Sequence, residues 1–184
     1  RIIITACGTS MHAGMVSKYY FEDLAGIPTQ VEQAAEFRCR NPIVEQNTLV
    51  IPVSQSGETL DTLTALREAV NKGALVAAIC NVVGSSIARE SGRGIYLHAG
   101  PEISVASTKA FTCQTAVLLL VALRFARGRR LSEEDGVSIA AEAENIPELI
   151  KATLAHAEEI EQIAKKYADM NSCFYIGRGY LYPA

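Results

Sequence analysis

The sequence predicts an α/β fold, a three-layer αβα sandwich built around a five-stranded parallel sheet. Short apolar segments alternate with helical patterns through the first two-thirds of the chain, and strands that alternate with helices of about 10–15 residues form βαβ units. At 184 residues, 49% hydrophobic and 20% charged, the chain has the size and composition of one compact domain with a buried core.

Five apolar segments are predicted to be the strands. The first is β-branched and ends at Gly8, and the second is the weakest of the five. The third contains Pro52, which removes one hydrogen bond from its ladder, and the fourth is apolar throughout, as expected of a strand covered on both faces. The segments are residues 2–7, 29–32, 49–53, 75–80 and 95–97.

Three helices are predicted to connect and follow these strands. The first covers residues 11–24 and stops before Gly26, and the second covers 58–72 and is closed by Gly73. The third, 106–127, is apolar nearly all round at its centre and is therefore expected to be deeply buried.

The sequence changes character after Gly128. Ser132 and the acidic residues after it resemble a capping box that opens a less apolar helix, and from Ile146 onward apolar residues recur at helical spacing. That spacing predicts an amphipathic helix lying on the surface of the domain. Residues 173–176 are again strand-like and end at Gly177, so they are expected to open a further βα unit.

Composition and charge argue against several classes of function. With 17 basic and 20 acidic side chains the formal net charge is -3, which favours neither a nucleic acid nor an anionic membrane as partner. The longest apolar run, residues 116–123, is shorter than the roughly 20 residues that a bilayer span needs, and no signal peptide opens the chain. Five scattered cysteines without a C-x-x-C pair argue against a disulfide framework and a zinc site, so we expect a reducing cytoplasm and no metal.

Three predicted strand ends are rich in glycine and hydroxyl groups, and each leads straight into a predicted helix. They are residues 7–10, 54–59 and 105–108. Ligands of parallel α/β sheets bind beyond the carboxyl ends of the strands, and a helix start offers unpaired N–H groups and a positive dipole end to an anion. The three segments are therefore predicted to form one anion-binding site.

The segment 54–59 is the strongest of these candidates. It offers the hydroxyls of three residues, the amide of Gln55 and, at Gly57, a backbone that a ligand can approach closely. It contains no lysine or arginine, so binding would rest on hydrogen bonds and the helix dipole. The alternative is that Ser56 is only an N-cap and Gly57 only a turn. The chain has neither G-x-G-x-x-G nor G-x-x-x-x-G-K-[ST], which argues against a dinucleotide and a nucleoside triphosphate.

Together these motifs resemble a known family. C-G-T-S at 7–10, S-Q-S-G-E-T at 54–59 and V-A-S-T-K-A-F at 105–111 occur in order over nearly the whole chain. In this combination the chain resembles the SIS (sugar isomerase) family, and within it the branch that uses glutamine-derived ammonia to convert fructose 6-phosphate to glucosamine 6-phosphate. The departures from the pattern are Met11, Cys39 and Cys113, and none of them lies in 54–59.

The resemblance implies a fold and roles for individual residues. The fold would be the SIS-type three-layer sandwich, which is flavodoxin-like or Rossmann-like. The side chains of residues 54–56 and of Thr59 would hold the phosphate of fructose 6-phosphate, and the other segments would contact the sugar. The full set of implied substrate-binding residues is Gly8, Thr9, Ser10, Ser54, Gln55, Ser56, Gly57, Thr59, Val105, Ala106 and Ser107.

The resemblance also implies how the chain is organised. Residues 1–131 would be the SIS domain, 132–171 a helical connector, and 172–184 the start of a second, incomplete SIS subdomain. The catalytic glutamate, lysine and histidine would come from that second subdomain, so no catalytic residue and no cofactor is assigned to this chain. A glutaminase domain would precede it, and a homodimer is expected. An SIS module that senses a sugar phosphate for a regulator, or another phosphosugar isomerase, is the alternative.

Other candidate residues near these segments are interpreted as structural. Cys7 ends a strand and is expected to be buried rather than nucleophilic, and Glu58 is expected to favour a helix start by its charge. His12 could face the site but is interpreted as structural, whereas Lys109 could be structural or lie behind the substrate-contacting residues. His98 and His156 are interpreted as surface or packing residues.

Overall fold

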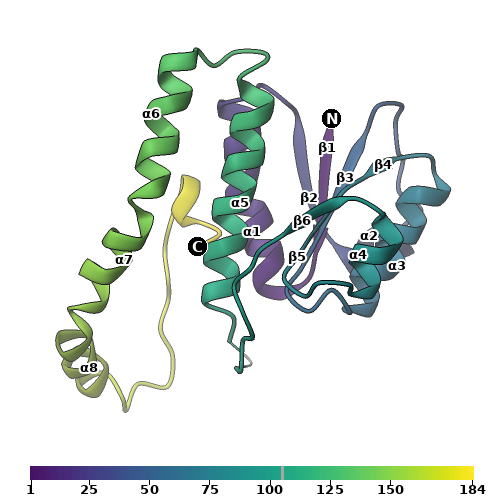
Figure 1. Cartoon of the computed structure of the whole chain (residues 1–184). Coiled ribbons are helices and arrows are strands. Elements are labelled where there is room, and N and C mark those ends of the chain that lie inside the picture. The colour runs from purple at the N-terminus through teal and green to yellow at the C-terminus, as the bar shows by residue number, and fades with distance from the viewer. Residues whose placement is uncertain (105) are drawn as a thin grey trace.

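A computed structural model describes residues 1–104 and 106–184 of the chain (Figure 1). Its sheet is parallel, in the order β2-β1-β3-β5-β6, with β4 beside β3. The strands are β1 (Ile2–Ala6), β2 (Thr29–Gln33), β3 (Leu49–Ser54), β4 (Leu75–Val76), β5 (Ala78–Cys80) and β6 (Gly94–Tyr96). The predicted α/β class and parallel sheet are confirmed.

The sixth strand arises because the predicted strand 75–80 is split in two. β4 pairs with Leu49 and Val50 of β3, and β5 pairs with Val53 and Ser54. Between these pairs lies Pro52, which has no N–H to donate to a ladder. The ladder is therefore interrupted on that side of β3. The one predicted strand becomes β4 and β5, so the sheet has six strands instead of the predicted five.

Helices cover both faces of the sheet, which confirms the three layers. α1 (Gly8–Asp23) and α5 (Lys109–Ala126) pack on one face, over a core that includes Ile2 and Ile4. α2 (Ala34–Cys39), α3 (Leu60–Asn71) and α4 (Ser86–Ser91) pack on the other, over a core that includes Ile3. Successive side chains of β1 thus enter opposite cores, as the pleat requires.

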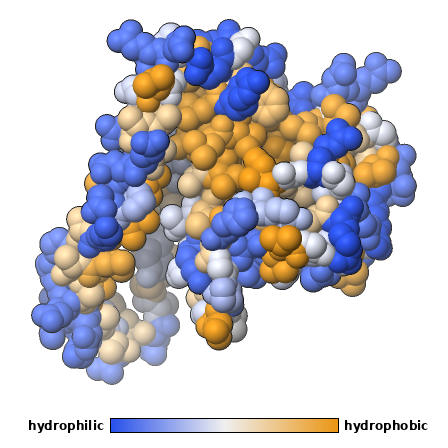
Figure 2. Space-filling view, in the orientation of Figure 1, coloured by the Kyte–Doolittle hydropathy of each residue, from blue (hydrophilic) through white to orange (hydrophobic). Residues whose placement is uncertain are grey.

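Helix α5 is buried on one side only, so its predicted deep burial is half right. Ala110, Leu118 and Ala122 are fully buried, whereas Leu120 is 52% and Phe125 37% exposed. Figure 2 shows the resulting apolar patch over α5. By length and composition alone this helix could cross a membrane. In the structure it packs along α1 against the sheet, as a core helix does.

Beyond α5 the chain forms a helical arm that leaves the sheet (Figure 1). It consists of α6 (Glu133–Glu144), α7 (Ile146–Leu154) and α8 (Ala157–Lys166). The predicted N-cap of α6 is present, because Ser132 Oγ accepts a hydrogen bond from Asp135 N at 3.1 Å. The prediction that one amphipathic helix from Ile146 lies on the surface of the domain is wrong. The segment is two helices, and neither has a buried residue, because α1 to α5 already cover both faces of the sheet.

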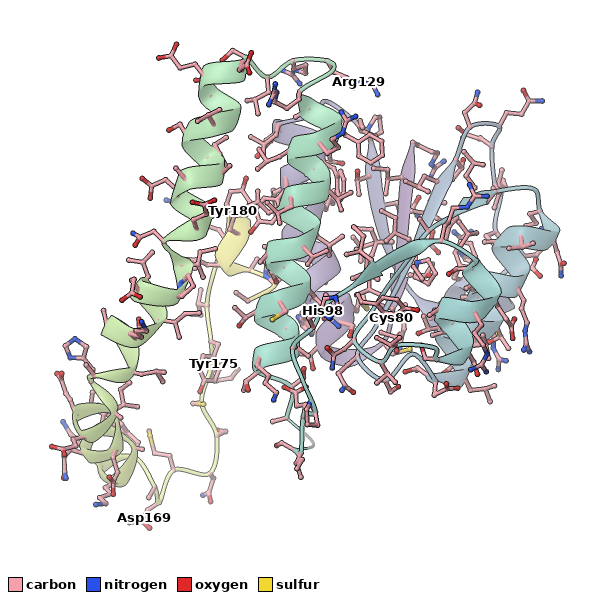
Figure 3. The ribbon with its side chains drawn as sticks, viewed as in Figure 1. Cys80, His98, Arg129, Asp169, Tyr175 and Tyr180 are labelled. Carbon is pink, nitrogen blue, oxygen red and sulfur yellow. The ribbon has the colours of Figure 1, made fainter. Side chains whose placement is uncertain are left out.

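The last segment returns to α1 instead of forming a strand. The prediction of a strand at 173–176 is wrong: these residues pair with no strand that the structure describes, and a lone strand leaves its backbone groups unpaired. The short 3-10 helix η1 (Gly179–Leu181) follows. In it, the ring of Tyr180 lies 5.0 Å from that of Tyr19 and 5.6 Å from that of Tyr20, and its hydroxyl donates to Asp23 (Figure 3).

Candidate functional site

Two of the three hydroxyl-rich segments lie at the carboxyl edge of the parallel sheet, which is the lower edge in Figure 1. The third was also predicted to be a strand end, but β6 ends at Tyr96, and residues 106–108 directly precede α5 instead. β1 leads into residues 7–10 and β3 into residues 54–59. Side chains link the elements: Thr62 Oγ1 of α3 lies 3.9 Å from Cys7 Sγ, and Gln114 Nε2 of α5 donates to Ser10 Oγ at 2.9 Å. The starts of α1 and α3 and the first turns of α5 therefore lie together.

Helix α1 begins earlier than expected, at Gly8, so that Thr9 and Ser10 belong to its first turn rather than to a preceding loop. Gly8 and Thr9 are exposed and Ser10 is partly buried. In the third segment, Ala106 is exposed and Val105 lies outside the described residues.

The segment 54–59 is a tight turn held by its own hydroxyls. Ser54 Oγ accepts a hydrogen bond from Gly57 N at 3.0 Å and lies 3.2 Å from Thr59 Oγ1. Ser56 Oγ accepts from Glu58 N at 3.1 Å, and Gly57 has a left-handed backbone with φ of +67°. Gln55 and Ser56 are partly exposed, whereas Ser54 is buried. The turn thus presents polar groups while its base is fixed.

Ser56 is not the N-cap that the alternative interpretation required. The N-cap of α3 is Thr59, and its side chain makes no capping hydrogen bond. Within the described part of the chain, the first-turn N–H groups of α3 are therefore left open at the point where the turn ends. Such groups attract an anion.

The segment that joins β5 to α4 supports this turn from behind. Asn81 N donates to the carbonyl of Gln55 at 3.3 Å, and Ile87 N donates to the carbonyl of Gly57 at 3.0 Å. Glu58 turns away from α3, because its Oε1 accepts from Ser86 N at 2.8 Å at the start of α4. Hydrogen bonding by Ser86 lowers the pKa of the Glu58 carboxyl. Glu58 is thus part of the support of the turn.

Gly57 is required where it stands. A Cβ atom at this position would lie 2.0 Å from Ser85 Oγ and 2.4 Å from Ser85 Cβ. Ser85 is 3% exposed, so its side chain has no open space to enter. The close approach of these two residues locks the turn against the β5–α4 segment.

The start of α5 differs from the start of α3, because it already holds a carboxylate. Glu102 accepts from Ser107 Oγ and from Thr108 N, both at 2.9 Å, and from Ala110 N at 3.4 Å. These hydrogen bonds, with that of Thr108 N the strongest, lower the pKa of the Glu102 carboxyl. Lys109 Nζ donates to the carbonyl of Pro101 at 2.5 Å, so Lys109 has a structural role in the loop before α5.

Stability should depend on pH through Glu102. Its lowered pKa means that the carboxylate stabilises the fold above the ordinary value of 4.5, and that this contribution is lost as the pH falls through the folded-state pKa. Glu102→Gln should therefore melt at a lower temperature than the wild type at pH 7, with the gap closing below pH 4.5. A gap in melting temperature that stays constant from pH 7 to pH 3, followed by circular dichroism, would contradict this role.

A cavity of about 410 Å³ opens beside Gln55. Asn81 shapes its wall by donating to the carbonyl of Gly100 at 2.8 Å and accepting from Ala99 N at 2.9 Å. His98, which was interpreted from the sequence as a surface or packing residue, also lines this cavity and is therefore close to the candidate site (Figure 3). Its backbone is left-handed, with φ of +53°. A second cavity, of about 250 Å³, lies between α4 and β6 and is lined by residues of β5, α4 and β6 and of the segment between α4 and β6.

The remaining candidates have other contacts. His12 Nδ1 lies 2.9 Å from the carbonyl oxygen of Pro183, and His156 pairs with Glu159 on α8. Cys7 is partly buried. Cys80 is buried, and this burial raises the pKa of its thiol to about 11, so that the Cys80 thiol stays protonated at neutral pH. In the described ranges, no group of three or more histidine, cysteine or acidic side chains is placed to hold a metal ion.

Comparison with known proteins accounts for this arrangement. The SIS domain family matches residues 1–124 of the 184. The chain belongs to the SIS domain family. This confirms the resemblance that the three motifs indicated.

The SIS domain has relatives of known name. The whole chain is 50% identical, over 183 residues, to glutamine–fructose-6-phosphate aminotransferase (isomerizing) of Chlorobaculum tepidum, covering 100% of this chain but 30% of that protein. It superposes with a TM-score of 0.96 and 41% identity on the C-terminal domain of glucosamine-fructose-6-phosphate aminotransferase from Francisella tularensis, covering 99% of this chain and 52% of that one.

A putative phosphosugar isomerase from Silicibacter pomeroyi is more distant, with a TM-score of 0.68 and 30% identity over 80% of this chain and 43% of that one. The chain spans 30% of the length of the curated aminotransferase relative.

Proposed function

We propose that this SIS domain binds fructose 6-phosphate as the sugar-phosphate-binding half of an isomerase region. The parent protein would be a glutamine–fructose-6-phosphate aminotransferase that makes glucosamine 6-phosphate with glutamine-derived ammonia. Identity of 50% to one protein of that name over the whole chain supports this assignment. The phosphate would lie on the side chains of Ser54, Gln55, Ser56 and Thr59, above the backbone of Gly57.

The observation that carries the proposal is the contrast between two helix starts. The first turn of α3 has no side-chain cap, whereas Glu102 accepts from the N-cap Thr108 N and from Ala110 N in the first turn of α5. An anion brought to this edge of the sheet would be repelled by the carboxylate at α5 and attracted by the N–H groups and hydroxyls at α3. The sugar would then extend toward Gly8, Thr9 and Ser10 on α1, and toward Val105, Ala106 and Ser107.

The organisation of the parent is part of the proposal. Residues 1–131 form the SIS domain, 132–171 a helical connector, and 172–184 open a second SIS subdomain that supplies the catalytic glutamate, lysine and histidine. A glutaminase domain precedes the chain, the protein is a cytoplasmic homodimer, and no cofactor is used. The 30% coverage of the aminotransferase relative supports a longer parent.

A second candidate is a module that binds a sugar phosphate in another context. The likeness to a putative phosphosugar isomerase supports this alternative. The flanking coding sequence separates the two. A glutaminase domain with an N-terminal cysteine upstream fits the aminotransferase, and a helix-turn-helix domain upstream fits a regulator.

The phosphate site is tested by two substitutions. Ser56→Ala and Thr59→Val each remove a hydroxyl that would donate to a charged ligand, which is worth about 1.5–3 kcal/mol. Each should weaken fructose 6-phosphate binding about tenfold or more, as measured by calorimetry, and fructose itself should not bind.

Thr64→Val is the matched control for these variants. The Thr64 hydroxyl donates only within α3, to the carbonyls of Leu60 and Asp61, so this variant should keep the wild-type affinity. Unchanged affinity in both Ser56→Ala and Thr59→Val would move the phosphate to another place.

A further inference from the structure

The buried face of α5 carries one polar side chain, that of Gln114, and we propose that this residue positions Ser10 for sugar-phosphate binding. The inference rests on the proposed function, in which Ser10 contacts the ligand. Gln114 lies in the core between α5 and α1, 104 positions along the chain from Ser10, and is 0% exposed. Its hydrogen bond to the candidate site is the one to Ser10.

The hydrogen bonding of the Gln114 amide is incomplete. Its Nε2 donates to Ser10 Oγ at 2.9 Å, but its Oε1 has no partner among residues 1–104 and 106–184. A buried amide oxygen without a partner destabilises a fold, whereas an apolar side chain of similar shape would leave nothing unpaired. Leucine or methionine at this position would therefore make the core at least as stable. The hydrogen bond to Ser10 is the contribution that only the amide makes.

That bond determines what the Ser10 hydroxyl can do. A hydroxyl has one donor and two acceptor positions, and Gln114 Nε2 occupies an acceptor position, so the proton of Ser10 remains available. Ser10 is the third residue of α1 and has no preceding helical turn, whereas a serine deeper in a helix tends to donate to a carbonyl of the preceding turn. Ser17 does so on the same helix, donating to the carbonyl of Ala13 at 2.6 Å. Ser10 is only partly buried, so its available proton can reach a ligand oxygen.

Removal of the amide should therefore separate binding from stability. Gln114→Leu should raise the dissociation constant for fructose 6-phosphate about tenfold in calorimetry with the 184-residue chain, because the Ser10 hydroxyl loses the hydrogen bond that fixes its orientation. Its melting temperature should not fall, because an unpaired buried oxygen is removed. Gln114→Met should behave in the same way. Because methionine is more flexible than leucine, this variant shows whether any change in Gln114→Leu comes only from poor packing of leucine.

A double-mutant cycle with Ser10→Ala tests whether the two residues act together. Ser10→Ala should weaken binding, and Gln114→Leu should then weaken it no further. Without ligand, Ser10→Ala leaves the amide with no partner and should lower the melting temperature, which Gln114→Leu should restore. The control is Thr5→Val, since Thr5 Oγ1 is also buried without a described partner but faces the other core. Its affinity should equal that of the wild type.

The outcomes separate this inference from the proposed function. If Ser10→Ala weakens binding but both Gln114 variants bind like the wild type, the inference alone is overturned. Additive effects of Ser10→Ala and Gln114→Leu on affinity, or a parallel loss of affinity and stability in both Gln114 variants, also overturn it. If the wild type does not bind fructose 6-phosphate, the proposed function fails and the inference fails with it.

Discussion

Gly57→Ala should weaken fructose 6-phosphate binding at least about a hundredfold, which corresponds to about 2.7 kcal/mol. Two effects add. The left-handed backbone at φ of +67° costs an L-residue about 1–2 kcal/mol, and the new Cβ would lie 2.0 Å from Ser85 Oγ. Because Ser85 is buried, the turn has to move instead, and its movement displaces the side chains of Ser54, Ser56 and Thr59 together. Calorimetry with the purified variant measures the loss.

Two further variants separate the steric effect from the strain. Gly73→Ala places a side chain on an equally left-handed backbone, at φ of +80°, with no atom within 4 Å, at the far end of α3. It should lower the melting temperature and keep the affinity of the wild type. Gly57→Ala combined with Ser85→Gly removes the collision and should recover a large part of the binding. Binding by Gly57→Ala within threefold of the wild type would show that the shape of this turn does not determine affinity.

Much of the fold could be predicted because it depends on local patterns. The alternation of apolar runs with helical segments specifies the strands of a parallel sheet, and Gly73, with its left-handed backbone, marks the end of α3 as expected. The loss of one hydrogen bond at Pro52 was predicted. The resulting split of the strand 75–80 was not, because it depends on that strand being the neighbour of β3. Helices beyond residue 131 that lead away from the sheet were predicted and are present as α6, α7 and α8. The segment from Ile146 was wrongly placed on the surface of the domain, because apolar residues at helical spacing do not indicate which surface they contact.

The candidate site could be predicted at the level of segments but not of contacts. Two of the three hydroxyl-rich segments, 7–10 and 54–59, directly follow strands as predicted, whereas the third precedes α5 without following a strand directly. The start of α3 has no side-chain cap, whereas Glu102 accepts a hydrogen bond at the start of α5. This difference could not be predicted, because it depends on the conformation of the loop that carries Glu102. The contact between Gln114 and Ser10 joins residues 104 positions apart. Its one sequence signal is a glutamine on the face of α5 that is otherwise apolar.

The 184-residue chain should bind fructose 6-phosphate without converting it, even with ammonia supplied. Amination requires ring opening, imine formation and proton transfer between adjacent carbons, and each positioned acid or base usually contributes a factor of about 10²–10⁴ in rate. Three ionisable groups on the segments around the site are already engaged. Glu58 accepts from Ser86 N, Glu102 caps α5, and Lys109 Nζ donates to the carbonyl of Pro101. None of these three is free to form an imine or to move a proton.

The measurement is incubation of the purified chain with fructose 6-phosphate and ammonium, followed by detection of glucosamine 6-phosphate and glucose 6-phosphate. Neither should accumulate above the rate without protein. Addition of the C-terminal half of the isomerase region should give glucose 6-phosphate, and use of glutamine should require the N-terminal domain as well. His98 is the internal check, because it lines the cavity beside Gln55. Sustained product formation that Lys109→Ala, Glu58→Gln or His98→Ala abolishes would mean that the acid–base groups lie in this domain, and that the division between a binding half and a catalytic half is wrong.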